Sequence, residues 1–147
     1  KVTESNGNSC PVVNSAGALV DGLKVLGAKR IAILTPYQKP LTQLVCDYLE
    51  NEGFEVHDAM SLEVSNNLQV AALDPRAPIE HVKKLDTHGV DVIVASACVQ
   101  MPSLASIAAI QAQTGIPTLS AAVATTHQML THLGLSTSIP DAGELLK

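Results

Sequence analysis

Cys98 has the sequence surroundings that best suit chemistry. It follows an apolar, β-branched run at 90–94, and Pro102 stands four residues later. Such a run predicts a strand buried on both faces of a parallel sheet, and proline suits the first position of a helix. Cys98 is therefore expected just past the carboxyl end of a central strand, facing a helix amino terminus. Ligands bind at that edge of α/β sheets, and the helix dipole favours a thiolate there. The alternative is an inert core cysteine.

Two other polar positions follow expected strands. Tyr37 ends the turn Thr35-Pro36-Tyr37 after the apolar strand 31–34, on the same edge of the sheet as Cys98. Its ring could instead simply pack at the strand end. Asn67 ends Ser65-Asn66-Asn67, a predicted loop after a third strand that begins at 54–56 and continues less clearly to 64. Adjacent asparagines commonly form turns, although a side-chain amide can also orient a carboxylate.

Alternating strand and helix patterns fill the rest of the chain. We expect a short strand at 11–14 and a helix at 15–26 capped by Ser15. A second helix has its apolar stripe at Leu41, Leu44, Val45, Tyr48 and Leu49, with Cys46 outside the stripe as a structural residue. Weaker helices follow near 79–85 and from 102 to about 113, and a last strand and helix run from 116 to about 133. This order predicts an α/β fold with parallel strands and right-handed crossovers.

Composition narrows the function classes. The 147 residues suit one domain, and with 46% hydrophobic but 2% aromatic residues the core must consist of aliphatic side chains. A net charge of −5 without a basic cluster argues against nucleic acid as a partner, and no apolar run approaches transmembrane length. Three cysteines without a disulfide pattern predict a reducing, cytoplasmic setting. The five histidines lack metal-ligand spacing, so we expect no metal site.

A weak internal repeat relates the two ends of the chain. Residues 11–23 align with 117–129, each as strand, small-residue turn and helix. This repeat suggests that each copy closes one half of a larger two-part structure. Chance similarity between two such units is the alternative.

Several motifs together resemble maleate cis-trans isomerase, of the aspartate/glutamate racemase superfamily, to which arylmalonate decarboxylase also belongs. They lie at 15–20, 35–37, 62–64 with Asn67, 115–117 and 121–126, and the most specific is Ser-Ala-Cys-Val-Gln-Met-Pro-Ser-Leu at 96–104. The resemblance covers only the carboxyl-terminal portion of such an enzyme. It implies a three-layer fold, a parallel sheet flanked by helices, as one lobe of a two-lobe structure. Residues 1–10 are then a loop or tail, 11–115 form the lobe that carries Cys98, and 116–147 pack with the other lobe. Without that lobe, we expect 116–147 to join the edge of the same sheet or to reach a partner chain.

The resemblance also implies a chemistry. A thiolate from the other lobe adds to maleate, the central bond rotates, and elimination gives fumarate, with Cys98 as acid or base. Tyr37, Asn67 and the amides of Val99 and Gln100 would hold the carboxylates of this small dicarboxylate. No cofactor is implied, and neither Cys10 nor Cys46 matches the motif of the other cysteine. By itself, the fragment is therefore expected to lack a complete active site.

Two alternatives remain open at this point. A cofactor-independent amino-acid racemase also uses two opposed thiols, one to abstract an α-proton and one to donate a proton to the other face. A folded lobe or dimerisation unit without catalysis is the other alternative. In each case we expect a homo-oligomer, because an exposed apolar strand invites association.

Overall fold

Four parallel strands form the sheet at the centre of the molecule. The computed structural model describes residues 11–147, so the tail predicted at 1–10, with Cys10, lies outside the described residues. The strands are β1 (Arg30–Thr35), β2 (Glu55–Ser61), β3 (Val92–Ser96) and β4 (Thr118–Ser120), in the order β2-β1-β3-β4. The helices are α2 (Ser15–Val25), α3 (Lys39–Asn51), α4 (Asn67–Ala71), α5 (Ala77–Val82), α6 (Leu104–Thr114) and α7 (Ala121–His132), followed by the 3₁₀ turn η1 (Glu144–Leu146). The predicted α/β class is confirmed.

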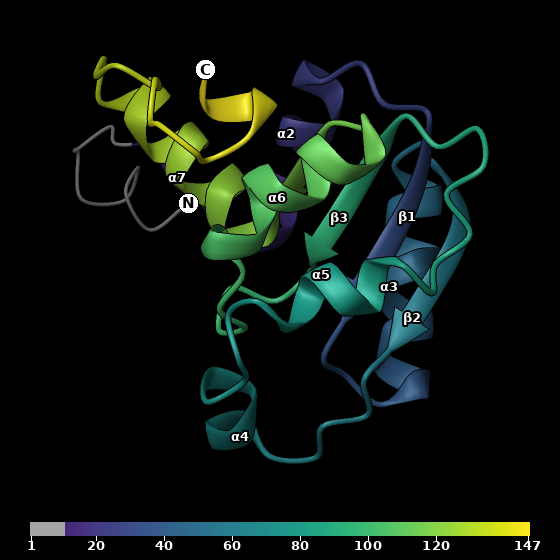
Figure 1. The fold of residues 1–147 in the computed structure, drawn as a ribbon. Coiled ribbons are helices and arrows are strands. Elements are labelled where there is room, and N and C mark those ends of the chain that lie inside the picture. Colours follow the sequence, from purple (N-terminus) through teal and green to yellow (C-terminus); the bar gives the residue numbers. More distant parts are fainter. Residues whose placement is uncertain (1–10) are drawn as a thin grey trace, which may run out of the picture.

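Helices cover both faces of the sheet. In the view of Figure 1, α5 and α6 cross in front of the strands, whereas α2 and α3 lie behind them. Helix α7 packs against α2 beyond the β4 edge. Gly22 permits this close approach, because a Cβ at that position would lie 3.1 Å from the Cβ of Ala124. The result is the three-layer arrangement predicted from the sequence.

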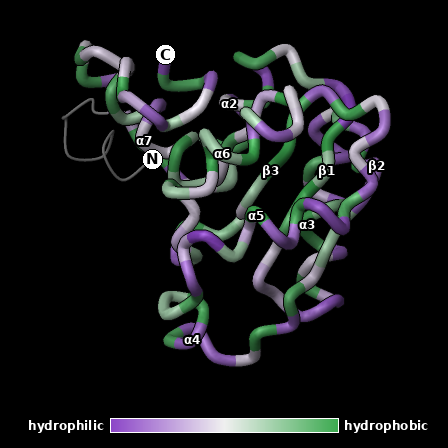
Figure 2. The backbone as a smooth tube through the Cα atoms, viewed as in Figure 1, coloured by the Kyte–Doolittle hydropathy of each residue, from purple (hydrophilic) through white to green (hydrophobic). Residues whose placement is uncertain are grey.

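Aliphatic side chains of the two central strands form the core. Every residue of β3 is buried, and five of the six residues of β1 are buried. The register pairs Ile31 with Val92 and Ile33 with Val94, and this hydrophobic centre is visible in Figure 2. A strand with buried side chains on both faces is typical of the middle of a parallel sheet. Thus β3 is held rigidly between β1 and β4.

The predicted strand at 11–14 is wrong. These residues pair with no strand among residues 11–147. Asn14 instead caps α2, because its side-chain oxygen accepts a hydrogen bond from the amide of Gly17 at 2.8 Å. The cap is thus Asn14, and the predicted cap Ser15 is the first helical residue. A β-region residue with a short polar side chain is favoured at this position.

Helix α3 presents a different face to the core than its apolar stripe predicts. Leu41, Leu44 and Tyr48 are exposed, whereas Cys46 and Leu49 are buried. The helix packs mainly against β2, an edge strand with partly exposed residues. Only the side of the helix turned toward the sheet is therefore covered, and much of the stripe faces outward.

Segment 116–147 packs on the same body as the rest of the chain. Strand β4 pairs with β3 at the edge of the sheet, and η1 contacts both β4 and α7. Its packing with a second lobe stays a prediction. No helix within 11–147 combines the length and apolar character needed to cross a membrane.

Candidate active site at the carboxyl edge of the sheet

Cys98 lies two residues beyond β3, at the carboxyl edge of the sheet. It is a free thiol, 7% exposed, in a small apolar cluster with Leu34, Val70 and Met101. This edge is where α/β sheets bind ligands. The sulfur therefore combines a rigid strand behind it with an apolar environment around it.

The proline prediction is wrong in detail. Helix α6 begins at Leu104 with Ser103 as its N-cap, so Pro102 precedes the helix and does not form its first turn. Ser103 has φ −143° and ψ −12°, which is not helical, and the helix starts only after it. The chain between Cys98 and Ser103 is occupied by a separate turn.

That turn runs from Cys98 to Met101. The amide of Met101 donates to the carbonyl of Cys98 at 3.3 Å, and the hydroxyl of Ser96 donates to the same carbonyl at 2.8 Å. The hydroxyl oxygen of Ser96 also accepts from the amide of Cys98 at 3.2 Å. The turn is thereby fixed to the last residue of β3.

Val99 and Gln100 occupy the two central positions of this turn, and both are exposed. Among residues 11–147, neither of their backbone amides donates to a protein acceptor. Successive free amides in a turn can donate to an anion. The sequence-based assignment of these amides to a carboxylate stays a prediction.

Tyr37 joins the site from the loop after β1. Burial is the largest cause that raises its pKa above the usual value, followed by a hydrogen bond to the side chain of Cys98 and the charge of that thiol. The phenol therefore keeps its proton, and Tyr37 packs against the cluster that contains Cys98. The structure brings together Tyr37 and Cys98, which are 61 residues apart in the sequence.

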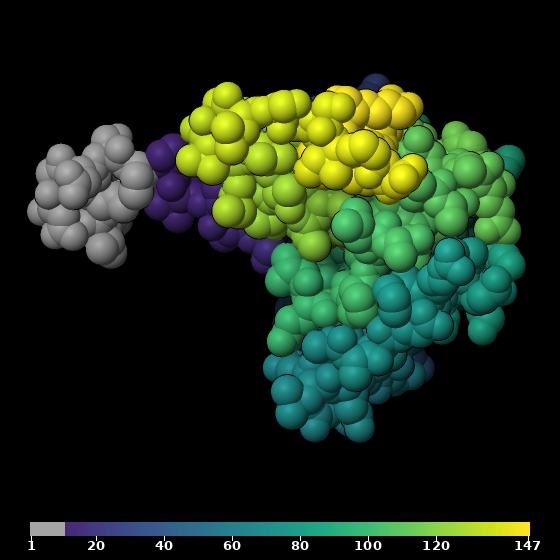
Figure 3. Space-filling view, turned by 60° about the vertical axis from the view of Figure 1, so that its left-hand side comes forward, coloured from purple at the N-terminus to yellow at the C-terminus, as the bar shows by residue number. Residues whose placement is uncertain are grey.

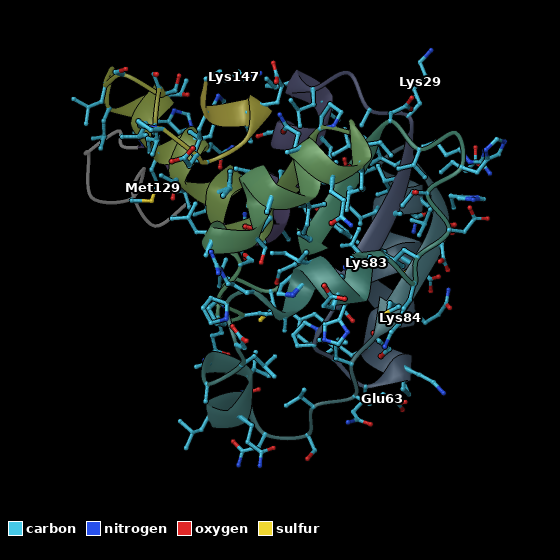
Figure 4. The ribbon with its side chains drawn as sticks, in the orientation of Figure 1. Lys29, Glu63, Lys83, Lys84, Met129 and Lys147 are labelled. Atoms are coloured by element: carbon cyan, nitrogen blue, oxygen red, sulfur yellow. The ribbon has the colours of Figure 1, made fainter. Side chains whose placement is uncertain are left out.

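The end of β2 and the segment that follows it hold the Tyr37 loop. The carbonyl of Tyr37 accepts from the hydroxyl of Ser61 at 2.5 Å and from the amide of Glu63 at 3.1 Å. Glu63, labelled in Figure 4 on the connection to α4, has φ +55°. Non-glycine residues adopt this left-handed region infrequently. The backbone bends there so that residues 62 and 64 can also donate to the loop, at Thr35 and Pro36.

The assignment of Asn67 to a substrate carboxylate stays a prediction. It is the first residue of α4, it is exposed, and within the described residues its side chain forms no hydrogen bond with Cys98 or Tyr37. Asn66 is the cap, accepting from the amide of Leu68 at 2.8 Å, so the predicted loop 65–67 ends in a helix start. Helix α4 and its flanking loops project beyond the carboxyl edge of the sheet (Figures 1 and 3). Val70 anchors α4 to the cluster around Cys98.

Three residues of this site were not predicted from the sequence. Ser96 holds the turn, while Met101 and Val70 bury the thiol. Ser96 is the first residue of the motif at 96–104, but only the fold shows that its hydroxyl forms hydrogen bonds with the backbone of Cys98. In the described part of the chain, no cluster of three or more His, Cys, Asp or Glu side chains is placed to hold a metal ion.

Comparison with known proteins adds independent information. The family model "Arylmalonate decarboxylase" matches residues 3–146. The chain is 57% identical over 143 residues to the maleate isomerase of Alcaligenes faecalis, covering 97% of this chain and 56% of that protein. It is 51% identical over 145 residues to the maleate isomerase of Geobacillus stearothermophilus, covering 99% and 58%.

Solved structures give the same result. A cysteine-to-alanine variant of the maleate isomerase Iso from Pseudomonas putida S16 with maleate has a TM-score of 0.94 at 54% identity, covering 99% of this chain and 58% of that chain. A cysteine-to-serine variant of the Nocardia farcinica maleate cis-trans isomerase, with a covalently bound succinylcysteine intermediate, has a TM-score of 0.93 at 42% identity, covering 97% and 58%. This chain therefore spans a little over half the length of these relatives.

Proposed function

Because the chain belongs to the arylmalonate decarboxylase family, we propose that it forms the Cys98 half of an active site that converts maleate to fumarate. The family relationship suggested by the sequence motifs is confirmed. The observation that carries the proposal is the pair of free amides at Val99 and Gln100, next to a buried thiol against which Tyr37 packs.

The substrate fits the groups of this site. Maleate carries two carboxylates on adjacent alkene carbons, so one carboxylate can accept from the amides of Val99 and Gln100 while the neighbouring carbon faces the sulfur of Cys98. Hydrogen bonds to a charged acceptor are stronger than neutral ones. They strengthen further when negative charge moves from the alkene onto that carboxylate, which is the requirement for catalysis.

The proposed reaction uses Cys98 as an acid and then as a base. An opposing thiolate forms a carbon–sulfur bond to one alkene carbon, and the π electrons move to the other carbon, which takes the proton of the Cys98 thiol. The former double bond is now a carbon–carbon single bond, and rotation about it follows. The Cys98 thiolate then removes that proton, the double bond re-forms in the trans geometry, and the carbon–sulfur bond breaks. The phenol of Tyr37 stabilises the Cys98 thiolate between the two proton transfers.

The opposing thiol is proposed to belong to a lobe outside these 147 residues. Cys46 is unsuitable, because it is buried on α3 and borders a separate cavity with Thr42 and Asp58. Its pKa is raised first by burial and then by the charges of Glu50 and Asp47, so its thiolate is disfavoured. The Nocardia farcinica relative, which has a cysteine replaced by serine and still carries a succinylcysteine, supports a mechanism with two distinct cysteines.

A chimera tests the proposal. The matched part of the Alcaligenes faecalis maleate isomerase is replaced by this chain, and conversion of maleate to fumarate is followed by proton NMR. We expect the chimera to form fumarate, the 147-residue chain alone to form none, and Cys98→Ser in the chimera to lower turnover by on the order of a thousandfold. A folded chimera without activity, or a Cys98→Ser chimera with full activity, would contradict the proposal.

We further propose that the chain associates with a second copy. Leu41, Leu44 and Tyr48 form an exposed apolar stripe on α3, next to a groove of about 250 Å³ that Tyr37 and Ala97 also line. Covering such a surface is favourable. Light scattering of the chain and of Leu44→Gln is expected to show a dimer that the substitution weakens, and a monomeric wild-type chain would contradict this.

A further inference from the structure

We infer that Ser96 is a positioning residue for the Cys98 turn, an inference that rests on the proposed function. Its hydroxyl holds the turn that carries the thiol of Cys98 and the amides of Val99 and Gln100. Ser96 does not touch the sulfur through any hydrogen bond within residues 11–147 and acts through the backbone of Cys98.

The geometry around the hydroxyl is specific. Ser96 is fully buried, and its oxygen donates to the carbonyl of Cys98 at 2.8 Å while it accepts from the amide of Cys98 at 3.2 Å. One hydroxyl thus binds both backbone polar groups of the same residue. The other bond that closes the turn, from the amide of Met101, is longer at 3.3 Å. The turn therefore depends mainly on Ser96.

This arrangement decides which amides remain free. The amide of Cys98 is used internally by Ser96, so it is not available to a substrate. The next two amides, at Val99 and Gln100, have no protein acceptor among residues 11–147. The Cys98 amide therefore fixes the turn through Ser96, and the amides of Val99 and Gln100 stay free to bind a carboxylate.

The other strands that end in a buried hydroxyl do not share this arrangement. Thr35 at the end of β1 pairs with the hydroxyl of Thr42 on α3, at 2.6 Å. Ser120 at the end of β4 caps α7 by accepting from the amide of Val123 at 3.3 Å. Only at β3 does the terminal hydroxyl bind the residue that carries the thiol. The contrast argues for a role beyond filling the core.

Alkylation of Cys98 by iodoacetamide tests the inference in the 147-residue chain, with the modified residue identified by peptide mass spectrometry. Ser96→Ala is expected to raise the alkylation rate by about fivefold or more, because the released turn exposes Cys98, which is otherwise a buried residue with 7% exposure. Saturating maleate is expected to slow alkylation of the wild type but not of Ser96→Ala, because the released amides no longer hold a carboxylate.

Two controls separate positioning from general stability. Ser106→Ala removes another fully buried hydroxyl, which donates to the carbonyl of Pro75, and is expected to leave the alkylation rate of Cys98 within about twofold of wild type. If Ser96→Ala does not fold, the isosteric pair Ser96→Thr and Ser96→Val repeats the comparison. The threonine variant keeps the hydroxyl, so its Cys98 is expected to be alkylated at the wild-type rate. The valine variant lacks the hydroxyl, so its Cys98 is expected to be alkylated faster, as in Ser96→Ala.

The outcomes are distinct. A wild-type alkylation rate in Ser96→Ala, or equal rates in the threonine and valine variants, would overturn the inference. Absence of maleate protection in the wild type, together with faster alkylation of Ser96→Ala, would contradict the proposed function while supporting the role of Ser96 in holding the turn.

Discussion

Replacing Tyr37 by phenylalanine removes the hydroxyl that interacts with the side chain of Cys98. The ring and its packing stay, so the change isolates the hydroxyl. A hydroxyl beside the sulfur stabilises negative charge on the reacting sulfur, so the variant is expected to react more slowly with iodoacetamide.

The size of the effect follows from the surroundings of the hydroxyl. A hydrogen bond to a charged group contributes about 1.5–3 kcal/mol. Tyr37 is only partly buried and sulfur is a weak acceptor, so we expect about 1–2 kcal/mol, which corresponds to roughly 5- to 30-fold slower alkylation of Cys98. Tyr48→Phe is the matched control, because Tyr48 is an exposed tyrosine on α3, and it is expected to leave the rate unchanged.

The same variant has a pH signature. The pKa of Tyr37 is raised above its usual 10.0 in the folded state, so the unfolded chain loses this proton first as the pH rises. The contribution of Tyr37 to the free energy of unfolding is therefore fully present below about pH 10 and is lost as the pH rises above that value. Urea unfolding is expected to show this alkaline loss in the wild type and a smaller loss in Tyr37→Phe. Equal alkylation rates and equal alkaline profiles in the two proteins would refute the reasoning.

Three further predictions concern the fold. The pKa of Asp91 is held below 3.8 mainly by two backbone amides, so its stabilisation is present above that pH and lost as the pH falls below it. Because Asp91 is exposed and solvent screens its charge, urea unfolding of Asp91→Asn is expected to show a loss of less than about 1 kcal/mol at neutral pH and less acid sensitivity than wild type. Gly143→Ala is expected to lower the free energy of unfolding by about 3 kcal/mol, because its Cβ would lie 2.5 Å from a side chain of α6. The control Gly27→Ala has open space and a similar positive φ, and it is expected to cost about 1 kcal/mol. Equal costs in thermal unfolding would contradict this prediction. Leu49→Ala is expected to cost about 2–5 kcal/mol and Leu44→Ala less than about 1 kcal/mol, and the reverse order would show that the side of α3 that carries Leu44 is its buried face.

The strand and helix order was predictable from the sequence because the aliphatic runs are short and separated by clear stops. The buried run of β3 and the glycine after α3 are examples, and both elements lie where the pattern placed them. The face of α3 was not predictable, since a strongly apolar stripe indicates the core only when something covers it. Leu44 meets solvent because the sheet reaches only the opposite side of the helix.

The site was predictable in its residue types but not in its connections. The position of Cys98 after β3 follows from the strand pattern, and the proximity of Tyr37 follows from the shared edge of parallel strands. Helix α6 begins at Leu104, later than the predicted start at Pro102, because the Cys98–Met101 turn precedes it. Ser96 was missed because its role depends on a hydrogen bond between neighbours, which no spacing in the sequence reveals.

An NMR titration of the ¹⁵N-labelled chain with maleate tests the central claim most directly. The account predicts saturable chemical-shift changes concentrated at the amides of Val99 and Gln100, with a dissociation constant on the order of millimolar, as two charge-assisted hydrogen bonds in an open site allow. Unchanged shifts at these two amides, or saturable changes elsewhere in the chain, would contradict the claim that the Cys98 turn is a carboxylate site.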